Sequence, residues 1–400
     1  MGSNQWCTMN NDVFILGTAR TAIGTFGGTL SDTTPTELGA AVSKEAILRS
    51  NIDPADIGHV VFGHVINSEP KDMYLSRVSA ISADIPDKTP AMNVNRLCGS
   101  GAQAIVSIFQ SLKLGDAQFG LAGGVENMSR SPHIVSASRW GKKMGEAKVL
   151  DMMIGALNCP FGTGHMGVTA ENIAAELSIS RQEQDEFSLE SQKRALNALN
   201  EGFFKNQIVP LNILKKRQTI VFDKDEHPKH TTMENLSELQ PIFQKGGTVT
   251  AGNASGINDG AAALVLGTSE SVLNRGLNPV AKVLGYAHSG VKPEVMGLGP
   301  IPAVNKLCKK LKLNTSDFDT IESNEAFAAQ ACAVTKELAL NPEKVNPNGG
   351  AIALGHPVGA TGAILVIKAI SELQRTKKNL ALITMCIGGG QGIAIAIEAT

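Results

Sequence analysis

The chain has 400 residues, 42% of them hydrophobic, and its 36 Lys and Arg against 37 Asp and Glu give a formal net charge of -1. This balance excludes the strongly basic surface expected of a protein that binds nucleic acid or an acidic membrane. The length is sufficient for a large core divided into at least two domains.

The sequence carries no clear targeting peptide, membrane span or paired-cysteine motif. No apolar run approaches the roughly 20 residues of a membrane-spanning helix. The polar residues 1–5 resemble neither a signal peptide nor a transit peptide, so we expect a cytoplasmic protein without membrane contact. The six cysteines form no C-x-x-C pair and no zinc-ligand spacing, and we therefore expect neither a disulfide framework nor a metal site.

The first part of the chain alternates strand and helix signals. Residues 13–16 are typical of a buried strand, residues 36–50 of an amphipathic helix and residues 60–62 of a second strand. A strand over residues 92–94 then leads to Cys98, after which apolar residues keep a helical period to about Leu114. Cys98 is therefore predicted to lie at a strand-to-helix turn.

The character of the sequence changes between residues 124 and 249, where charged residues and irregular segments surround two predicted helices at 169–177 and 181–200. We interpret this segment as an inserted loop domain. The strand pattern resumes at 261–266. This pattern predicts three domains. Residues 1–123 together with 250–276 form an N-terminal half, residues 124–249 form the loop domain, and residues 277–400 form a C-terminal half.

The C-terminal half repeats the order of the first. The interval from Asp317 to His356 is close in length to that from Asp56 to Cys98, and Gly355-His356-Pro357 is predicted to open a helix as Cys98 does. Each copy then returns through a strand to glycines, at 123–124 and at 388–390. Two copies related by a pseudo-twofold axis would bring both helix N-termini to one site.

Cys98 has the setting of a nucleophile. The partial positive charge of a helix N-terminus lowers the pKa of a thiol, and Gly99 and Gly101 would allow a bulky thioester to approach the sulfur. The alternative is a small buried side chain at a helix start.

Three further positions carry candidate chemistry. His356, between Gly355 and Pro357, suits a general base, although a lone histidine is also typical of a structural hydrogen bond. Cys386 precedes a Gly-rich loop whose N–H groups could line an oxyanion site, but an isolated cysteine is more typical of a core. Asn324, at a predicted strand end, could hold a water beside His356 or cap the next helix.

Together these segments resemble the thiolase family over nearly the whole chain, most closely the short-chain bacterial β-ketothiolases. The segments that carry the resemblance are Asn95-Arg96-Leu97-Cys98-Gly99-Ser100-Gly101, Gly252-Asn253-Ala254-Ser255-Gly256, Asn324-Glu325-Ala326-Phe327, Gly355-His356-Pro357 and Cys386-Ile387-Gly388-Gly389-Gly390-Gln391-Gly392. The resemblance implies an α/β fold with two tandem βαβαβαββ halves in an αβαβα layered core and an inserted loop domain.

The resemblance also implies a ping-pong reaction through an acyl-Cys98 intermediate, with acetyl-CoA, acetoacetyl-CoA and CoA as substrates and no separate cofactor. His356 would activate Cys98, and Cys386 would move the α-proton of acetyl-CoA. The N–H groups of Cys98 and Gly388 would form one oxyanion hole. Asn324, through a water, would form the other with His356.

Further residues receive binding roles from the resemblance, which also implies a homotetramer built as a dimer of dimers. Lys229 matches a position near the CoA phosphates where the family usually has arginine. Its ammonium group would supply a point charge but not the bidentate hydrogen bonds of a guanidinium group. Met166 alone could equally be core and His165 a structural hydrogen-bonding residue. The residues implied for the acyl pocket and pantetheine tunnel are Leu157, His165, Met166, Phe243, Ala251, Ser255 and Phe327.

Three other functions compete with this interpretation. A β-ketoacyl synthase would usually place histidines, or His and Asn, around its cysteine, whereas this chain has Cys386. A degradative long-chain 3-ketoacyl-CoA thiolase would share all the catalytic motifs and differ only in its acyl pocket. A non-catalytic CoA- or lipid-binding module would be expected to have lost Cys98, His356 or Cys386, and all three are present.

Overall fold

The computed structural model describes residues 12–215 and 217–400. Residues 1–11 of the predicted N-terminal half therefore lie outside the described residues. The elements of that half are β1 (Val13–Arg20), β2 (Gly24–Thr25), α1 (Pro35–Ser50), β3 (Ile57–Gly63), α2 (Leu75–Ser82), β4 (Ala91–Val94), α3 (Ser100–Leu114), β5 (Phe119–Asn127), β12 (Asn258–Thr268) and α8 (Ser269–Asn274).

The second half repeats this order after β12. Its elements are β13 (Ala281–Gly290), α9 (Pro300–Leu311), β14 (Thr320–Ser323), α10 (Ala328–Glu337), α11 (Ala351–Leu354), α12 (Thr361–Thr376), β15 (Leu380–Ile387) and β16 (Gln391–Ala399). The predicted third strand of this half is reduced to one bridge between Ile321 and Val345. Pro347, which has no N–H to donate to a ladder, follows closely.

The strands of both halves join in one 10-stranded mixed sheet, in the order β14-β15-β16-β13-β1-β12-β5-β3-β4, with β2 paired to β12. In the first half β3 pairs in parallel with both β4 and β5, and in the second half β14 pairs in parallel with β15. Strands β5 with β12 and β15 with β16 pair antiparallel. The halves meet where β1 and β13 pair antiparallel, with Val13 opposite Val283. This matching topology confirms the predicted tandem fold.

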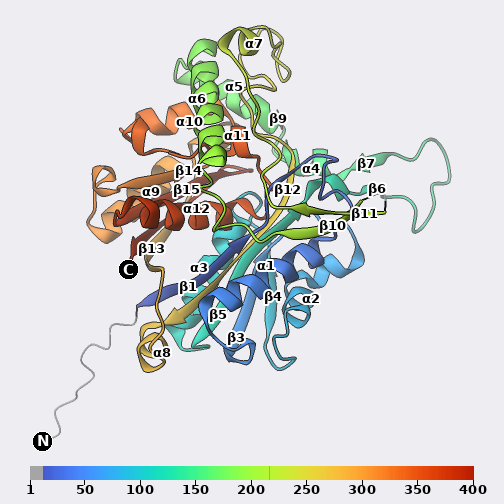
Figure 1. Ribbon diagram of the computed structural model, residues 1–400. Helices are drawn as coiled ribbons and strands as arrows, with labels where there is room; N and C mark the ends of the chain where they lie inside the picture. Colours follow the sequence, from blue (N-terminus) through green and yellow to red (C-terminus); the bar gives the residue numbers. More distant parts are fainter. Residues whose placement is uncertain (1–11, 216) are drawn as a thin grey trace, which may run out of the picture.

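Helices form layers on both sides of the sheet (Figure 1). Helices α1 and α2 cover the outer side of the first half and α9 and α10 that of the second, while α3 and α12 pack against each other between them. The close approach of α3 and α12 requires glycine, because a Cβ on Gly362 would lie 2.3 Å from the backbone N of Ala102. Helix α12 is almost wholly buried, as a central layer requires.

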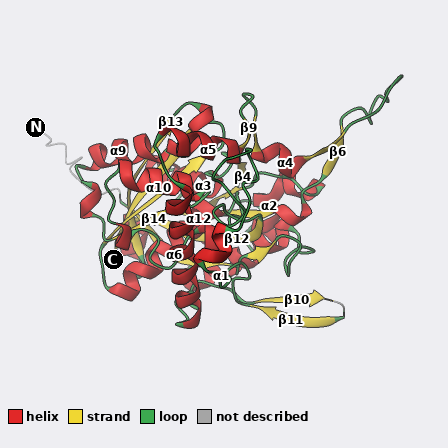
Figure 2. Cartoon of the chain, turned by 90° about the horizontal axis from the view of Figure 1, so that it is seen from above, coloured by secondary structure: helices red, strands yellow, loops and turns green. Residues whose placement is uncertain are grey.

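The inserted segment runs between β5 and β12. Helix α6 begins where the sequence indicates, at a capping box formed by its N-cap Ser180 and its third residue Glu183, whereas α5 begins at Met166, three residues before the predicted start. Figure 2 shows two hairpins, β6–β7 and β10–β11, projecting from the same end of the molecule. The elements are β6 (His133–Val135), β7 (Val149–Asp151), α4 (Met152–Leu157), β8 (Asn158–Cys159), β9 (Gly164–His165), α5 (Met166–Glu176), α6 (Arg181–Asn200), β10 (Leu211–Lys215), β11 (Gln218–Phe222) and α7 (Met233–Ser237).

Two local predictions need correction. His356 does not open a helix directly: α12 begins at Thr361, because residues 357–360 form a turn in which Ala360 and Thr361 both donate their N–H to the carbonyl of Pro357. Gly123 and Gly124 are not counterparts of the 388–390 loop, since both lie inside β5. A Cβ at Gly124 would lie 2.2 Å from a backbone oxygen of the 357–360 turn, so close packing requires glycine there.

None of the helices within residues 12–215 and 217–400 combines the length and the apolar character needed to cross a bilayer.

Candidate active site

Cys98 lies in the turn between β4 and α3, two residues before the helix begins. The preceding residue, Leu97, has a left-handed backbone with φ of 46°, which is strained for a residue with a Cβ. Two side chains hold it: Asn95 Oδ1 accepts from its N–H at 2.9 Å, and Ser100 Oγ donates to its carbonyl at 2.6 Å. The turn therefore fixes the sulfur of Cys98 at the junction of strand and helix.

The pKa of Cys98 differs from the expectation. Burial raises the pKa of Cys98 above its usual value, and the Glu126 carboxylate raises this pKa further. The backbone N–H groups of Gly388 and of Cys98 itself lower the pKa, but their effect is smaller than that of burial. A helix N-terminus alone was expected to lower it, but the apolar surroundings of the sulfur penalise the thiolate more strongly. Cys98 is therefore a thiol at rest and needs a base.

Gly99 and Gly101 do not serve substrate access as predicted. A Cβ on Gly99 would lie 2.5 Å from the side chain of Ile387, and one on Gly101 would lie 2.8 Å from the backbone N of Ala363. Both glycines face protein, one toward β15 and one toward α12. They permit the two halves to pack closely, which brings the Gly388 N–H to the Cys98 sulfur.

His356 is buried between α11 and α12, at 5% exposure. Its backbone N–H donates to Asn258 Oδ1 at 3.0 Å, and its ring atoms Nδ1 and Nε2 lie 2.7 Å from Thr361 Oγ1 and 3.4 Å from Asn324 Nδ2. Burial lowers the pKa of His356 to about 4. The imidazole is therefore neutral near pH 7 and can accept a proton.

Asn324 follows the last residue of β14 and is fully buried. Its backbone N–H donates to the carbonyl of Thr384 at 3.0 Å, which fixes it to the neighbouring strand. Within the described residues its Oδ1 has no hydrogen-bond partner, although a buried amide oxygen normally has one. An Asn positioned in this way can orient a water or a substrate beside His356.

Cys386 is the penultimate residue of β15 and is fully buried. Burial raises its pKa, and the nearby Cys98 raises it further, so Cys386 is also a thiol at rest. The chain then turns through Gly389 and Gly390, with φ of 84° and 88°. This turn directs the N–H of Gly388 toward Cys98.

Two adjoining cavities surround these groups. The inner one, of about 60 Å³, is lined by Cys98, His356 and Gly388 together with apolar side chains that include Leu157 and Met166. The outer one, of about 560 Å³, shares His356 with it. Seven of the predicted binding residues line one or both: Leu157, His165, Met166, Phe243, Ala251, Ser255 and Phe327.

Aromatic contacts shape the outer cavity. The rings of His165 and Phe243 stack with centroids 4.6 Å apart, and Phe243 meets Phe327 edge-on at 6.0 Å. His165 also caps α5, with Nδ1 accepting from the N–H of Gly167 at 3.0 Å, so it combines a structural hydrogen bond with a place in the wall. Burial lowers its pKa and keeps the wall uncharged at neutral pH.

Lys229 lies outside both cavities. Its side chain is exposed, and its backbone N–H donates to Gln192 Oε1 at 3.0 Å. Its charge contributes to lowering the pKa of His227, after burial as the larger cause, to about 4. His227 lines the outer cavity, so Lys229 lies near its rim.

Glu126 and Thr361 are residues near the site that the sequence interpretation missed. The buried carboxylate of Glu126 accepts N–H bonds from Val65, Ile66 and Gly359, at 3.1, 3.1 and 2.9 Å, and so ties the 64–66 loop to the turn after His356. Its signal in the sequence is a carboxylate near the end of a buried strand, where open α/β sheets place ligands. Thr361 carries no comparable sequence signal.

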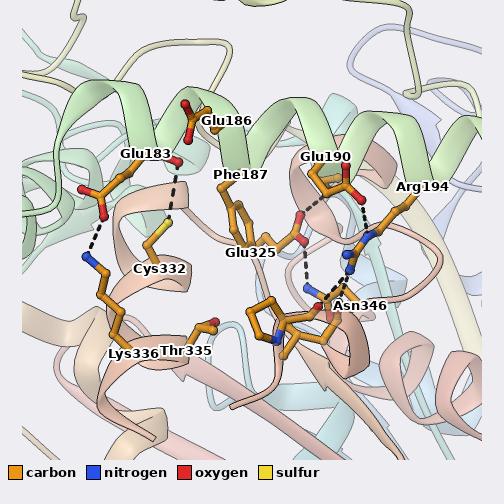
Figure 3. A pocket seen from close by; sticks show the side chains of 13 residues that line it. Glu183, Glu186, Phe187, Glu190, Arg194, Glu325, Cys332, Thr335, Lys336 and Asn346 are labelled. Atoms are coloured by element: carbon orange, nitrogen blue, oxygen red, sulfur yellow. Dashed lines mark hydrogen bonds and ion pairs between the residues drawn. The ribbon is translucent and has the colours of Figure 1, made fainter. Parts of the chain in front are cut away.

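A separate pocket of about 320 Å³ lies between α6 and α10 (Figure 3). Glu183, Glu186 and Glu190 line its α6 side, with Glu183 bonded to Lys336 at 2.6 Å. Burial raises the pKa of Cys332 in this pocket to about 12, so its thiol is unreactive. None of the predicted site residues lines it. Elsewhere in the described chain, no group of three or more His, Cys, Asp or Glu is arranged to hold a metal ion.

Comparisons with known proteins match nearly the whole length of the chain. A family model described as "Thiolase, N-terminal domain" matches residues 13–270, and "Thiolase, C-terminal domain" matches residues 277–399. "Beta-ketothiolase BktB" of Cupriavidus necator is 54% identical over 98% of this chain and 100% of its own length. "Acetyl-CoA acetyltransferase" of Escherichia coli K12 is 45% identical over 96% of this chain and 98% of its own length.

Two solved structures have the same fold. The acetyl-CoA acetyltransferase of Bacillus anthracis matches with a TM-score of 0.95 and 43% identity, covering 98% of this chain and 99% of that one. The human mitochondrial 3-ketoacyl-CoA thiolase matches with a TM-score of 0.95 and 40% identity, again over 98% and 99%.

Proposed function

The chain belongs to the thiolase family, and from that membership we propose that it is an acetyl-CoA C-acetyltransferase, which exchanges acetyl groups between acetyl-CoA, acetoacetyl-CoA and CoA. One observation carries the assignment of the site: the thiol of Cys98, the neutral imidazole of His356 and the N–H of Gly388 line one narrow cavity. The CoA thioester is itself the substrate, so the proposed reaction uses no separate cofactor and no metal.

The first half-reaction acylates Cys98. His356 Nε2 takes the proton of the Cys98 thiol, and the thiolate attacks the carbonyl carbon of an acetyl thioester. A new C–S bond forms, the bond to CoA breaks, and the CoA thiolate takes the proton back from His356. The N–H groups of Cys98 and Gly388, which face the sulfur, are suited to stabilise the oxyanion.

The second half-reaction requires proton transfer at the α-carbon of a second acetyl-CoA. For condensation the Cys386 thiol first gives its proton to His356 Nε2, and the Cys386 thiolate then takes the α-proton. The carbanion attacks the acetyl carbonyl, the C–S bond to Cys98 breaks, and the Cys98 thiolate takes the proton from His356. For thiolysis of acetoacetyl-CoA the Cys386 thiol protonates the departing carbanion and then takes from His356 the proton that came from Cys98. Its raised pKa favours that resting form. Asn324, through a water, and His356 Nε2–H stabilise the thioester enolate.

A degradative 3-ketoacyl-CoA thiolase remains the alternative, since a human mitochondrial enzyme of that title has the same fold. The inner cavity of about 60 Å³, walled by Leu157 and Met166, favours short acyl groups. A rate series over acetoacetyl-, 3-ketovaleryl- and 3-ketohexanoyl-CoA tests this: a steep fall after the shorter members supports the short-chain assignment, and a flat series supports the alternative.

The basic test is turnover of acetoacetyl-CoA with CoA, followed as loss of the enolate absorbance. Turnover that requires CoA supports the proposed activity. Binding of CoA without turnover at neutral pH would instead support a non-catalytic CoA-binding module.

We also propose a cytoplasmic homotetramer in which the β6–β7 hairpin joins two dimers. The hairpin and the segment between its strands expose apolar side chains, among them Trp140 at 91% exposure and Val149 at 62%. Contiguous exposed apolar surface is typical of protein interfaces. Sedimentation of the protein and of Trp140→Glu tests this, because the substitution should yield dimers.

A further inference from the structure

We propose that Thr361 is a positioning residue that fixes the tautomer of His356, so that the unprotonated Nε2 faces Cys98. This inference rests on the proposed function, because it assigns His356 the role of base. It concerns a hydroxyl group that has no place in the half-reactions described above.

The hydrogen-bond inventory of Thr361 determines its direction of donation. Oγ1 lies 2.9 Å from the carbonyl oxygen of Pro357 and 2.7 Å from Nδ1 of His356. A carbonyl oxygen can only accept, so the single hydroxyl hydrogen of Thr361 donates to Pro357. Its oxygen is then available only as an acceptor, and the ring atom that faces it must carry a hydrogen. Nδ1 of His356 is therefore the protonated nitrogen.

The opposite edge of the ring leads independently to the same tautomer. Nε2 of His356 lies 3.4 Å from Nδ2 of Asn324, an amide nitrogen that can only donate. A neutral imidazole carries one ring hydrogen, and the pKa of His356 is far below neutrality. Nε2 thus presents a lone pair to the side of the ring where Asn324 lies and the acyl chemistry occurs.

Local backbone geometry places the hydroxyl. Because α12 begins at Thr361 and not at Pro357, the turn of residues 357–360 carries Thr361 beneath the imidazole. Asn258 meanwhile holds the backbone N–H of His356 at 3.0 Å. His356 is therefore held at its backbone N–H and at both ring nitrogens. On the Nδ1 side of the ring, the contact with Thr361 is the one that favours one tautomer over the other.

The arrangement suits both states of the proton transfer. When the Cys98 proton moves to Nε2, a neutral pair becomes a thiolate and an imidazolium, and the Nδ1 hydrogen remains bonded to Thr361 Oγ1. In the opposite tautomer Nε2–H would face the donor amide of Asn324, and no lone pair would be available for the Cys98 proton. Thr361 therefore stabilises the competent base in its ground and protonated states.

The tautomer can be measured without any substrate. ¹⁵N NMR of wild-type protein labelled in its histidine rings, with His356→Gln used to assign the signal, should show Nδ1 protonated and Nε2 unprotonated at pH 7. A protonated Nε2 in the neutral ring would overturn the proposal. This measurement does not depend on turnover, so its failure is distinguishable from failure of the proposed activity.

Substitution tests the role of the hydroxyl. Thr361→Val keeps the shape but removes the acceptor, and we expect Cys98 alkylation by iodoacetamide at pH 7 and kcat both to fall by about tenfold or more, as loss of a general base predicts. Thr361→Ser keeps the hydroxyl, so the alkylation rate and kcat of this variant should both lie within about threefold of wild type, a much smaller change than loss of a general base causes. Thr376→Val is the matched control, because Thr376 makes the same hydroxyl-to-carbonyl bond at the other end of α12, to Glu372 at 2.6 Å.

The outcomes are decisive in either direction. Loss in Thr361→Val with retention in Thr361→Ser and Thr376→Val supports the proposal. Wild-type alkylation and an unchanged NMR tautomer in Thr361→Val would overturn it. If Thr361→Val does not fold, the tautomer of the wild-type protein and the activity of Thr361→Ser still decide the question.

Discussion

The backbone N–H of Gly388 faces the sulfur of Cys98, although the two residues belong to different copies of the repeat. The contact exists because Gly99 admits the side chain of Ile387 and the chain turns back immediately after Gly388. A donor that faces the attacking sulfur is also positioned for the oxygen of the carbonyl under attack. In the proposed mechanism, the union of the two halves creates an oxyanion site that neither half contains alone.

Gly388→Ala tests the geometry of this contact. A Cβ at that position would lie 3.1 Å from Met166 Cε and 3.3 Å from Leu97 Cδ1, so the added methyl group crowds two side chains that line the inner cavity. We expect turnover of acetoacetyl-CoA to fall modestly and that of 3-ketovaleryl-CoA to fall several times more. Gly155→Ala is a matched control, because nothing lies within 4 Å of a Cβ there. Equal loss for both substrates would contradict the predicted crowding.

Cys386→Ser separates the two half-reactions. A hydroxyl is a much weaker acid than a thiol, so proton transfer at the α-carbon should fail while acetylation of Cys98 proceeds. We expect acetyl incorporation from acetyl-CoA to persist and acetoacetyl-CoA formation to be lost. Cys308→Ser, at a buried cysteine of α9, controls for a general effect of the substitution. Equal loss of both steps would remove Cys386 from its assigned role.

Asn324→Ala removes a donor group and leaves His356 in place. Loss of one oxyanion-hole donor typically costs about 100- to 1000-fold in kcat, and we expect a loss in this range with little change in KM. The pH profile of Cys98 alkylation should remain like that of the wild type, because the base is retained. An increase in KM with unchanged kcat would indicate that Asn324 binds the ground state instead.

The buried histidine His64 should make the free energy of unfolding decrease at alkaline pH. Its charge interacts with Glu126 and Asp72, which together outweigh the effect of burial and raise the pKa of His64 from 6.5 to about 9. Because the folded pKa exceeds the unfolded one, this stabilisation is complete below pH 6.5 and is lost as the pH rises through 9. The urea midpoint should therefore decrease between pH 7 and pH 9.5.

His64→Gln supplies the control for that experiment. The thiols whose pKa burial raises, Cys98 and Cys386, also reduce stability at high pH, so the informative quantity is the difference between wild type and variant. The variant should be less stable at pH 7, and the difference should shrink toward pH 9.5. A difference that is constant with pH would exclude a charged His64.

Much of the fold could be predicted because local signals agree with it. The strand and helix order follows apolar periodicity, and α6 begins at a capping box visible in the sequence. The placement of Cys98 at a strand-to-helix turn and the tandem order of the halves follow from the same patterns. In the site, residues named by motif line two adjoining cavities, apart from Lys229, Asn324 and Cys386, which lie outside the cavity walls.

The remaining features depend on burial and on the docking of distant segments. The raised pKa of Cys98 arises from the depth of the sulfur, which the local sequence does not encode. The roles of Gly99 and Gly101 depend on β15 and α12, far along the chain. The contacts of Thr361 with His356 and of Glu126 with Gly359 appear only once the turn after His356 has folded against β5.

The acyl-Cys98 intermediate is the central claim, and acid quenching of the enzyme within its first turnovers, followed by peptide mass spectrometry, tests it most directly. With acetyl-CoA and no added CoA, wild-type protein should carry one acetyl group on the peptide that contains Cys98, and Cys98→Ser should carry almost none. Addition of CoA before the quench should remove the label. An unlabelled wild-type Cys98, or equal labelling of Cys98→Ser, would contradict the account.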